Sequence, residues 1–411
     1  ITQEDLQDKE FIDYWCAYYD ELKAHVAQFT PEWASEITGI AAEDIAAAAR
    51  LYAGAERGAI HWGLAFDTQV DSIQLCQTVS NLMSVCGNID KPGTNLLVRN
   101  GFEINPGYAT AQLYCDPDTF AKKLTVDLVH PGCKQFIGMA DCDAVNRAFE
   151  TGEPYPIKMG FYAGNNLMSC TSMEPKRWHD AIVKSLEFCI GFDTFMNPSI
   201  EASCDIFLPL KTVAEREGTV FTHYAPCTVT AGFMNKAIEV GDCLTDYELC
   251  YELGRRLRPE LWENEFKFRS AKEFMEALRL GKRENGAYFD EVSKNVVCQI
   301  PVDYYKYERG EMRQDGGPGF ATPTGRIELW STAFNQFGED PLPYYEEPEF
   351  GPANPELMKE YPFILTTGAR TSAFFHSEHR QIAYLRELNP DPITEINPAT
   401  AKKLGIAEIR A

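Results

Sequence analysis

The sequence predicts a multi-domain α/β protein built around parallel sheets. Its 411 residues are enough for about two to four domains. Its 45% hydrophobic and 12% aromatic residues are typical of a globular protein with sizeable cores. Between residues 157 and 192, an apolar run, a tight glycine loop, an amphipathic segment and a second apolar run follow one another. This is the order of a βαβ unit, whose two strands lie parallel in one sheet.

The first 110 residues are expected to form part of an α/β domain that contains helices and short strands. Residues 1–57 carry apolar and aromatic side chains at helical spacing, and an alanine-rich helix over 42–53 is expected to end at Gly54. A short strand over 58–62 and a helix over 72–86 are predicted to follow.

Residues 111–210 are expected to form a Rossmann-like, dinucleotide-binding α/β part. Strands are predicted over 157–162 and 186–192, with a third buried run over 204–210 that breaks at Pro209. The intervening helix is expected to begin at Pro175, with Thr171 and Glu174 as a capping box.

The remainder divides into three predicted parts. Residues 211–337 form a mixed α+β part, with amphipathic helices over 246–258 and 270–280 and a turn at Thr324-Gly325 that enters a strand. Residues 338–362 are rich in proline and glutamate and are expected to be an extended linker. A strand over 363–367 and a polar loop follow.

The charge of the chain excludes some partners. A net charge of −23 argues against nucleic acid or an anionic membrane as the main partner. No apolar run reaches the roughly 18 residues of a membrane span.

Thirteen cysteines stand singly without any C-x-x-C pair, so they are expected to be reduced and to act as small hydrophobic residues. The chain begins at Ile1 and stops at Ala411 inside a motif-like segment, which suggests a piece of a longer protein.

Polar residues are predicted to gather where two strands of the βαβ unit end. Gly164, Asn165 and Asn166 follow the first strand, and Asp193 and Thr194 follow the second. Ligands of open α/β sheets bind at the carboxyl ends of the strands, and a carboxylate there suits the donors of guanine or ribose hydroxyls. The loop lacks the G-x-G-x-x-G spacing of nicotinamide sites. An ordinary βα turn and a helix-capping aspartate are the alternatives. Asp205 is equally compatible with a structural role and with a ligand role.

A second polar cluster lies near the end of the chain. It places two arginines, two histidines and a serine within eleven residues, which suits an anionic ligand rich in hydrogen-bonding groups. A solvated polar loop is the alternative, and His376-x-x-His379 has no evident third metal ligand. The cluster comprises Arg370, His376, Ser377, His379 and Arg380.

Several segments in order resemble one family. They are residues 32–54, 62–95, 162–169 (YAGNNLMS), 192–219 (FDTFMNPSIEASCDIFLPLKTVAEREGT), 322–331 (TPTGRIELWS) and 366–392. Together they resemble the molybdopterin oxidoreductases of the dimethyl-sulfoxide-reductase family, which bind molybdenum or tungsten through two molybdopterin guanine dinucleotides. Residues 374–380 most resemble the branch that contains acetylene hydratase, transhydroxylases and catechol dehydroxylases.

The resemblance implies cofactor-binding roles for three groups of residues. Gly63 and Gln69 would lie near the metal end of the cofactor. The loops after the two strands would hold one guanosine diphosphate arm through Gly164, Asn165, Asn166, Asp193 and Thr194. The third group would hold pterin and phosphate groups through Thr367, Gly368, Arg370, His376, Ser377 and Arg380. Residues 363–411 would begin a truncated carboxy-terminal β-barrel.

The chain also departs from the family pattern. The cysteine cluster for a 4Fe-4S centre is absent, and the ligand to the metal is expected before Ile1. No catalytic or metal-binding residue is therefore assigned, and the chain alone is expected to be inactive. The loop reads Gly-Asn-Asn where many relatives have Gly-x-Asn-Pro.

The predicted function is the cofactor-binding portion of a bacterial molybdenum or tungsten enzyme of anaerobic respiration. Its reaction would be electron or oxygen-atom transfer, or dehydroxylation or hydration of a small substrate. Its partners would be an iron–sulfur electron-transfer subunit and a membrane-anchor subunit; cytoplasmic and exported locations stay open. One alternative is a non-catalytic module that lost the redox centre, which the sequence upstream of Ile1 would distinguish. Another is a generic nucleotide-binding enzyme.

Overall fold

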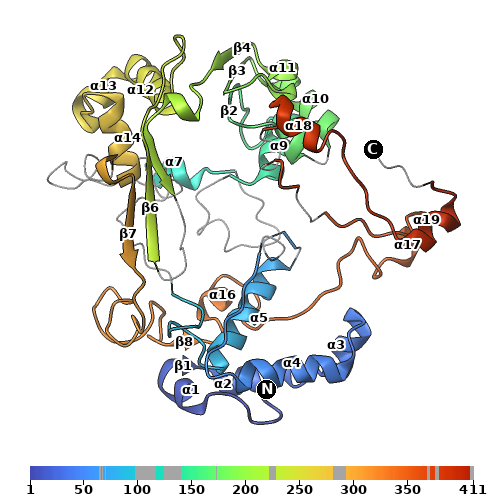
Figure 1. The fold of residues 1–411 in the computed structure, drawn as a ribbon. Coiled ribbons are helices and arrows are strands. Elements are labelled where there is room, and N and C mark those ends of the chain that lie inside the picture. The colour runs from blue at the N-terminus through green and yellow to red at the C-terminus, as the bar shows by residue number, and fades with distance from the viewer. Residues whose placement is uncertain are drawn as a thin grey trace. The chain divides into compact units, whose positions relative to one another are not determined.

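The computed structural model divides the chain into two units, Ile1–Glu346 and Glu347–Ala411. It describes residues 1–63, 66, 68–69, 71–97, 117–124, 140–172, 174–221, 228–280, 293–367, 371–374 and 379–407. Figure 1 shows the elements of both units along the chain. Among the described residues, none of the helices has the length and apolar character needed to cross a membrane.

The first core of unit 1 joins its amino-terminal helices to residues near 300–330. Tyr307 is almost fully buried and makes edge contacts with Phe11 and Trp15 and a stacked contact with Phe320. A two-stranded parallel sheet of β1 and β8 ties the same two regions together. The elements around this core are α1 (Lys9–Trp15), β1 (Cys16–Ala17), α2 (Tyr19–Val26), α3 (Pro31–Thr38), α4 (Ala42–Gly54), α5 (Ser72–Val85), β8 (Ile327–Glu328) and α16 (Thr332–Gln336).

A parallel sheet forms the centre of the predicted nucleotide-binding part. Its order is β2-β3-β4, so β3 is the central strand and is buried along most of its length. Ile190 and Phe192 of β3 pack against Leu249 of α12 (Asp246–Leu257). The elements are α7 (Pro117–Ala121), α9 (Cys142–Thr151), β2 (Met159–Ala163), the π-helix η1 (Leu167–Thr171), α10 (Pro175–Ser185), β3 (Phe188–Asp193), α11 (Pro198–Ser203) and β4 (Ile206–Pro209).

An antiparallel sheet of order β5-β6-β7 follows, with β6 and β7 running side by side (Figure 1). The aromatic rings of Tyr251, Trp262 and Phe274 pack together between α12, η3 and α14. The elements are the 3-10 helix η2 (Val213–Glu215), β5 (Gly218–Phe221), β6 (Thr228–Met234), α12 (Asp246–Leu257), α13 (Pro259–Leu261), the π-helix η3 (Trp262–Phe266), α14 (Ala271–Leu280) and β7 (Val297–Pro301).

The described part of unit 2 contains short helices and irregular segments. These helices are α17 (Pro355–Glu360), α18 (Ala383–Leu388) and α19 (Pro398–Leu404). Helix α17 lies inside the stretch that the sequence predicts as an extended linker, 338–362, so that prediction is wrong for these six residues. Asn354 caps the helix and Pro355 opens it, which is a helix-start signal that the high proline content obscured.

The structure confirms the predicted βαβ unit and the mixed α/β class. Strands β2 and β3 pair in parallel over Met159–Ala163 and Phe188–Phe192, with α10 between them in the chain. The predicted capping box of α10 is wrong. Thr171 belongs to η1, Glu174 stands at the N-cap, and the Glu174 amide donates to the Ser172 hydroxyl instead.

Two predicted strands do not form. The main chain of 58–62 pairs with side chains rather than with a strand: the amides of Gly58 and Ile60 donate to Asn88 and Asn95. Residues 363–367 have no regular structure, and their apolar side chains are exposed. Periodicity alone identified apolar runs there, but a strand also requires a neighbouring strand to bond with.

Candidate functional site

The carboxyl ends of the three parallel strands meet at one edge of the sheet. Asp193 at the end of β3 lies opposite Pro209 of β4, and Ala163 at the end of β2 lies opposite Phe192. The Gly164 amide donates to the Phe192 carbonyl at 3.0 Å, which joins the first loop to β3 beyond the end of the ladder. The sheet therefore brings together the two loops that the sequence places 30 residues apart, as the topology of a βαβ unit requires.

Asn197 ties these two loops to each other. Its side-chain amide donates to the Asn165 carbonyl and to a carboxylate oxygen of Asp193, both at 3.1 Å. Its side-chain oxygen accepts from the Ile200 amide and so caps α11. Because Asn197 is only 6% exposed, these contacts are protected from competing water.

Ser199 makes a second link beneath the first loop. Its hydroxyl donates to the side-chain oxygen of Asn166 at 2.7 Å and accepts from the Met168 amide at 2.8 Å. Ser199 is fully buried. The side-chain oxygen of Asn166 thus already accepts a hydrogen bond from the protein, whereas Asn165 is exposed to solvent.

The Asp193 carboxylate has three hydrogen-bond donors from its own loop. One oxygen accepts from the Thr194 amide at 2.6 Å and from the Thr194 hydroxyl at 3.2 Å, and the other accepts from Asn197. A carboxylate accepts about four hydrogen bonds. A ligand that donates two hydrogen bonds to Asp193 would therefore replace the Thr194 hydroxyl, which makes the longest of the three contacts.

The edge of the sheet presents both polar and apolar groups to solvent. Gly164 has a φ of +56° and no atom within 4 Å of the place where a Cβ would stand, so the loop leaves open space at this point. Thr194 is exposed, and the following Phe195 and Met196 are 47% and 52% exposed. Exposed hydrogen-bonding groups beside an aromatic ring suit a base with one polar edge and one flat apolar face. The described residues at this edge fit one nucleotide arm of a dinucleotide cofactor.

Asp205 has a structural role. Its carboxylate accepts from the Cys189 amide at 2.8 Å, and its own amide donates to the Cys189 carbonyl at 2.8 Å. These bonds fix the loop before β4 to the start of β3, away from the carboxyl edge. The alternative of a ligand role for Asp205 is not supported.

A separate region of unit 1 holds the predicted residues Gly63 and Gln69. Both are exposed, and the Gly63 carbonyl accepts from the Phe66 amide. The chain leading to Gly63 is held by the side chain of Asn95, which both accepts from and donates to the backbone of Ile60 at 2.8 Å.

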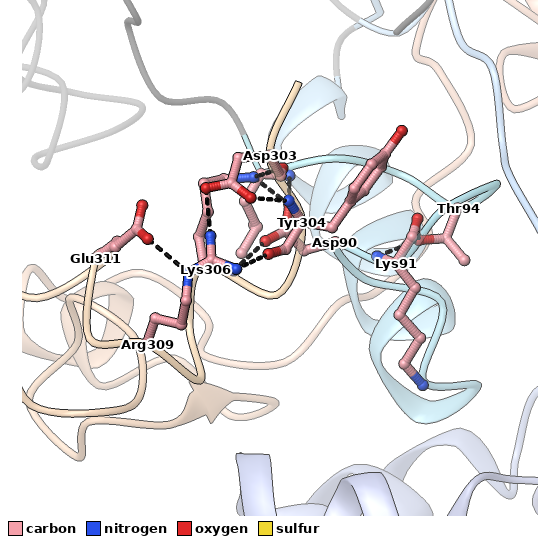
Figure 2. A network of polar contacts seen from close by, with 9 residues as sticks. Asp90, Lys91, Thr94, Asp303, Tyr304, Lys306, Arg309 and Glu311 are labelled. Atoms are coloured by element: carbon pink, nitrogen blue, oxygen red, sulfur yellow. Dashed lines mark hydrogen bonds and ion pairs between the residues drawn. The ribbon is translucent and has the colours of Figure 1, made fainter. Parts of the chain in front are cut away.

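A buried ion pair supports the loop that carries Asn95. Asp90 is fully buried, and Figure 2 shows its carboxylate facing the ammonium of Lys306. The Asp90 carboxylate accepts from the ammonium of Lys306 at 2.5 Å, from the amide of Lys306 at 2.8 Å and from the amide of Leu97 at 3.1 Å. The Lys306 ammonium also donates to the Asp303 carbonyl. Both charges are thus compensated by a partner and by additional hydrogen bonds.

Unit 2 contains the predicted pterin-binding cluster, and the structure describes part of it. Thr367 is exposed, and the exposed guanidinium of Arg380 lies 5.0 Å from the ring centre of the buried Phe374. A guanidinium over an aromatic face is held by a cation–π contact. The other predicted residues of this cluster, Gly368, Arg370, His376 and Ser377, lie outside the described residues.

The roles of Asn197 and Ser199 in joining the two loops were not predicted from the sequence. The signal was present, because Asn197 precedes Pro198 and an Asn-Pro pair is typical of a helix N-cap followed by its first residue. What the sequence could not reveal is that the cap also bonds across to Asn165. In the part of the chain that the structure describes, no group of three or more His, Cys, Asp or Glu side chains is arranged to hold a metal.

The fold places this chain among α/β proteins with a parallel sheet, a class whose ligands bind at the carboxyl edge of the strands. The family model described as molybdopterin oxidoreductase matches residues 3–255. The chain belongs to the molybdopterin oxidoreductase family.

Two curated proteins and one solved structure are similar along nearly the whole chain. Acetylene hydratase of Syntrophotalea acetylenica is 28% identical over 99% of this chain and 56% of its own length. Dopamine dehydroxylase of Eggerthella lenta is 27% identical over 95% of this chain and 45% of its own length. The solved structure of acetylene hydratase from Pelobacter acetylenicus matches 98% of this chain and 56% of that chain, with a TM-score of 0.82 and 26% identity. The chain thus spans about half the length of the curated relatives it matches.

Proposed function

We propose that this chain is the cofactor-binding portion of a molybdenum or tungsten enzyme that uses two molybdopterin guanine dinucleotides. The observation that carries the proposal is the carboxyl edge of the β2-β3-β4 sheet, where Asp193, Thr194 and Asn165 stand exposed or half-exposed. Membership of the molybdopterin oxidoreductase family supports a pterin cofactor. The guanine form is the finer part of the proposal, and the free acceptor capacity of Asp193 is what favours it.

When bound, the metal of such a cofactor supplies the redox or Lewis-acid chemistry, and the protein positions the cofactor and tunes its surroundings. Asp193 would accept from the base or the ribose, and Asn165 and Thr194 would bond the sugar or phosphate. Gly63 and Gln69 would lie near the metal end, and the cluster from Thr367 to Arg380 would hold pterin and phosphate groups.

The reaction class follows from the relatives and remains part of the proposal. Acetylene hydratase and dopamine dehydroxylase favour hydration or reductive dehydroxylation of a small substrate, and formate dehydrogenase H of Escherichia coli, 25% identical over 99% of this chain, favours electron transfer. We further propose that the parent enzyme is bacterial and works under anaerobic conditions. Its 4Fe-4S cluster and its metal ligand would lie outside this chain, and a β-barrel would begin within 363–411. Its partners would be an iron–sulfur subunit and a membrane-anchor subunit. A non-catalytic module is not favoured, since the named relatives are enzymes.

Replacing Asp193 by Asn tests the nucleotide site. The change keeps the size of the side chain but replaces one acceptor oxygen by a donor, so the guanine donors lose a charged partner. A hydrogen bond to a charged group contributes about 1.5–3 kcal/mol, which corresponds to roughly tenfold to hundredfold weaker binding. The measurement is guanine nucleotide released by acid per mole of the protein that contains this chain, and the variant is expected to release less.

Glu201→Gln is the matched control, because it removes an equal charge from an exposed residue of α11 in the same loop region. The control is expected to retain the guanine content of the unmodified protein. Equal guanine content in the Asp193→Asn variant and the control would overturn the assignment of Asp193 to the cofactor.

A further inference from the structure

Two cysteines stand in contact behind the loop of the candidate site. The sulfur atoms of Cys189 and Cys204 lie 3.4 Å apart. Cys189 belongs to β3 and is buried, whereas Cys204 follows α11 and is partly exposed. A disulfide bond joins sulfur atoms at about 2.05 Å, so a small closing movement separates this contact from a covalent bond.

The surrounding main chain holds the two sulfur atoms in place. Asp205, the neighbour of Cys204, exchanges two hydrogen bonds of 2.8 Å with the backbone of Cys189. Gly191 leaves the space that the second sulfur occupies: a Cβ on Gly191 would stand 3.1 Å from the Cys204 sulfur and 2.7 Å from a methyl carbon of Ile200. The hydrogen bonds between Asp205 and Cys189, together with the space left by Gly191, therefore hold the two thiols close to each other.

We propose that Cys189 and Cys204 form an oxidation site that closes to a reversible disulfide when the protein meets a peroxide. In the first step the Cys204 sulfur attacks one peroxide oxygen, the O–O bond breaks, and a sulfenic acid and water form. In the second step the Cys189 sulfur attacks the Cys204 sulfur, the S–O bond breaks and a second water leaves. Two thiols and one hydrogen peroxide thus give one disulfide and two waters.

Cys204 reacts first because it is the more accessible of the two. Burial raises the pKa of both thiols, that of Cys189 to about 12, so the thiolate is scarce at neutral pH and the first step is slow. The second step is favoured by contact, since the Cys189 sulfur already touches the sulfur that it attacks.

The disulfide would close a ring that contains the whole loop of the candidate site. Asp193, Asn197 and Ser199 all lie between the two cysteines in the chain. Oxidation would restrict the segment that contains Asn197, whose side chain bonds to both Asp193 and Asn165. This consequence for the cofactor rests on the proposed function, whereas the disulfide itself does not.

Peptide mass mapping tests the bond directly. The reduced protein is treated with hydrogen peroxide, the remaining thiols are blocked, and the protein is digested with a glutamate-specific protease. Cleavage after Glu187, Glu201 and Glu215 separates the two cysteines into peptides 188–201 and 202–215. We expect these peptides to be recovered joined, lighter by two hydrogen atoms than their sum, and to separate on reduction.

Two comparisons make the result decisive. Cys204→Ser is expected to abolish the joined peptides, while Cys250→Ser, at a cysteine of α12, is expected to leave them.

Slower hydrogen exchange of the amides between 194 and 203 after oxidation is the second readout, and it needs no variant. The proposal is overturned if Cys204 accumulates sulfinic acid without a joined peptide, or if both thiols stay unmodified while the exposed Cys142 and Cys170 are oxidised. None of these readouts depends on bound cofactor.

Discussion

Asp90 and Lys306 show how single residues of this chain combine a strained backbone with a buried charge. Asp90 has a φ of +55°, a region that non-glycine residues seldom adopt, and it has no exposed surface. The strain is tolerated because Asp90 bonds to two distant parts of the chain. Its carboxylate accepts from the Leu97 and Lys306 amides, and its carbonyl accepts from the Tyr305 amide. The pair therefore fixes the loop that carries Asn95.

Lys306→Met is expected to destabilise unit 1 strongly. The variant keeps an apolar chain of similar length but leaves the Asp90 carboxylate buried without its charged partner. Breaking a buried pair in this way costs about 3–5 kcal/mol of unfolding free energy. Urea unfolding followed by tryptophan fluorescence measures the change, since Trp15 packs against Tyr307 in the same core.

Arg50→Met provides the control for Lys306→Met. Arg50 pairs with Glu4 on the surface, where a salt bridge contributes about 0–1 kcal/mol. The double variant Asp90→Asn with Lys306→Met is expected to recover part of the loss, because it removes the unpaired charge. If Lys306→Met and Arg50→Met shift the urea midpoint equally, the ion pair does not support the core in the way we describe.

At the scale of elements, Asn197 links a helix cap to the candidate site. The chain offers a matched pair of sites: Asn197-Pro198 opens α11 and Asn354-Pro355 opens α17, and each helix has six residues. Replacing either asparagine by alanine removes an N-cap, which costs about 1 kcal/mol. Only Asn197→Ala also frees the Asn165 carbonyl and one oxygen of Asp193.

We therefore expect Asn197→Ala, and not Asn354→Ala, to lower the guanine nucleotide content of the protein that contains this chain. Thermal unfolding of both variants shows whether the cap losses are comparable. If both variants keep the full guanine content, the bridge between the two loops is dispensable for binding.

The elements also show which features a single sequence can predict. The βαβ unit was predictable because its strands are short apolar runs separated by a proline-started helix, and these are local signals. Asp193 and Gly164 were placed at one edge because strand direction follows from the same unit. The strands predicted over 58–62 and 363–367 are absent because pairing is a tertiary property: the first segment bonds to Asn88 and Asn95, and apolar composition could not reveal this. The bridge through Asn197 was unpredictable for the same reason.

At the scale of the whole molecule, a net charge of −23 opposes binding of the anionic dinucleotide cofactor that we propose, so binding would depend on local groups. The carboxyl edge of the parallel sheet provides uncharged donors such as Asn165 and Thr194, and the cluster that ends at Arg380 provides positive charge in the second unit. Under the proposed function, each of these two groups of residues would contribute cofactor contacts of its own, and the chain matches acetylene hydratase along nearly its whole length.

The central claim is that the protein containing this chain carries a molybdopterin guanine dinucleotide cofactor. The most direct measurement is the content of molybdenum, tungsten, oxidised pterin and guanine nucleotide in that protein after anaerobic expression and purification. We predict that the protein contains molybdenum or tungsten, pterin and guanine. The pterin and guanine contents should be equal to each other, at about two of each per metal atom, because the proposed cofactor has two dinucleotides on one metal. A folded protein purified in this way with neither metal nor pterin would contradict the account.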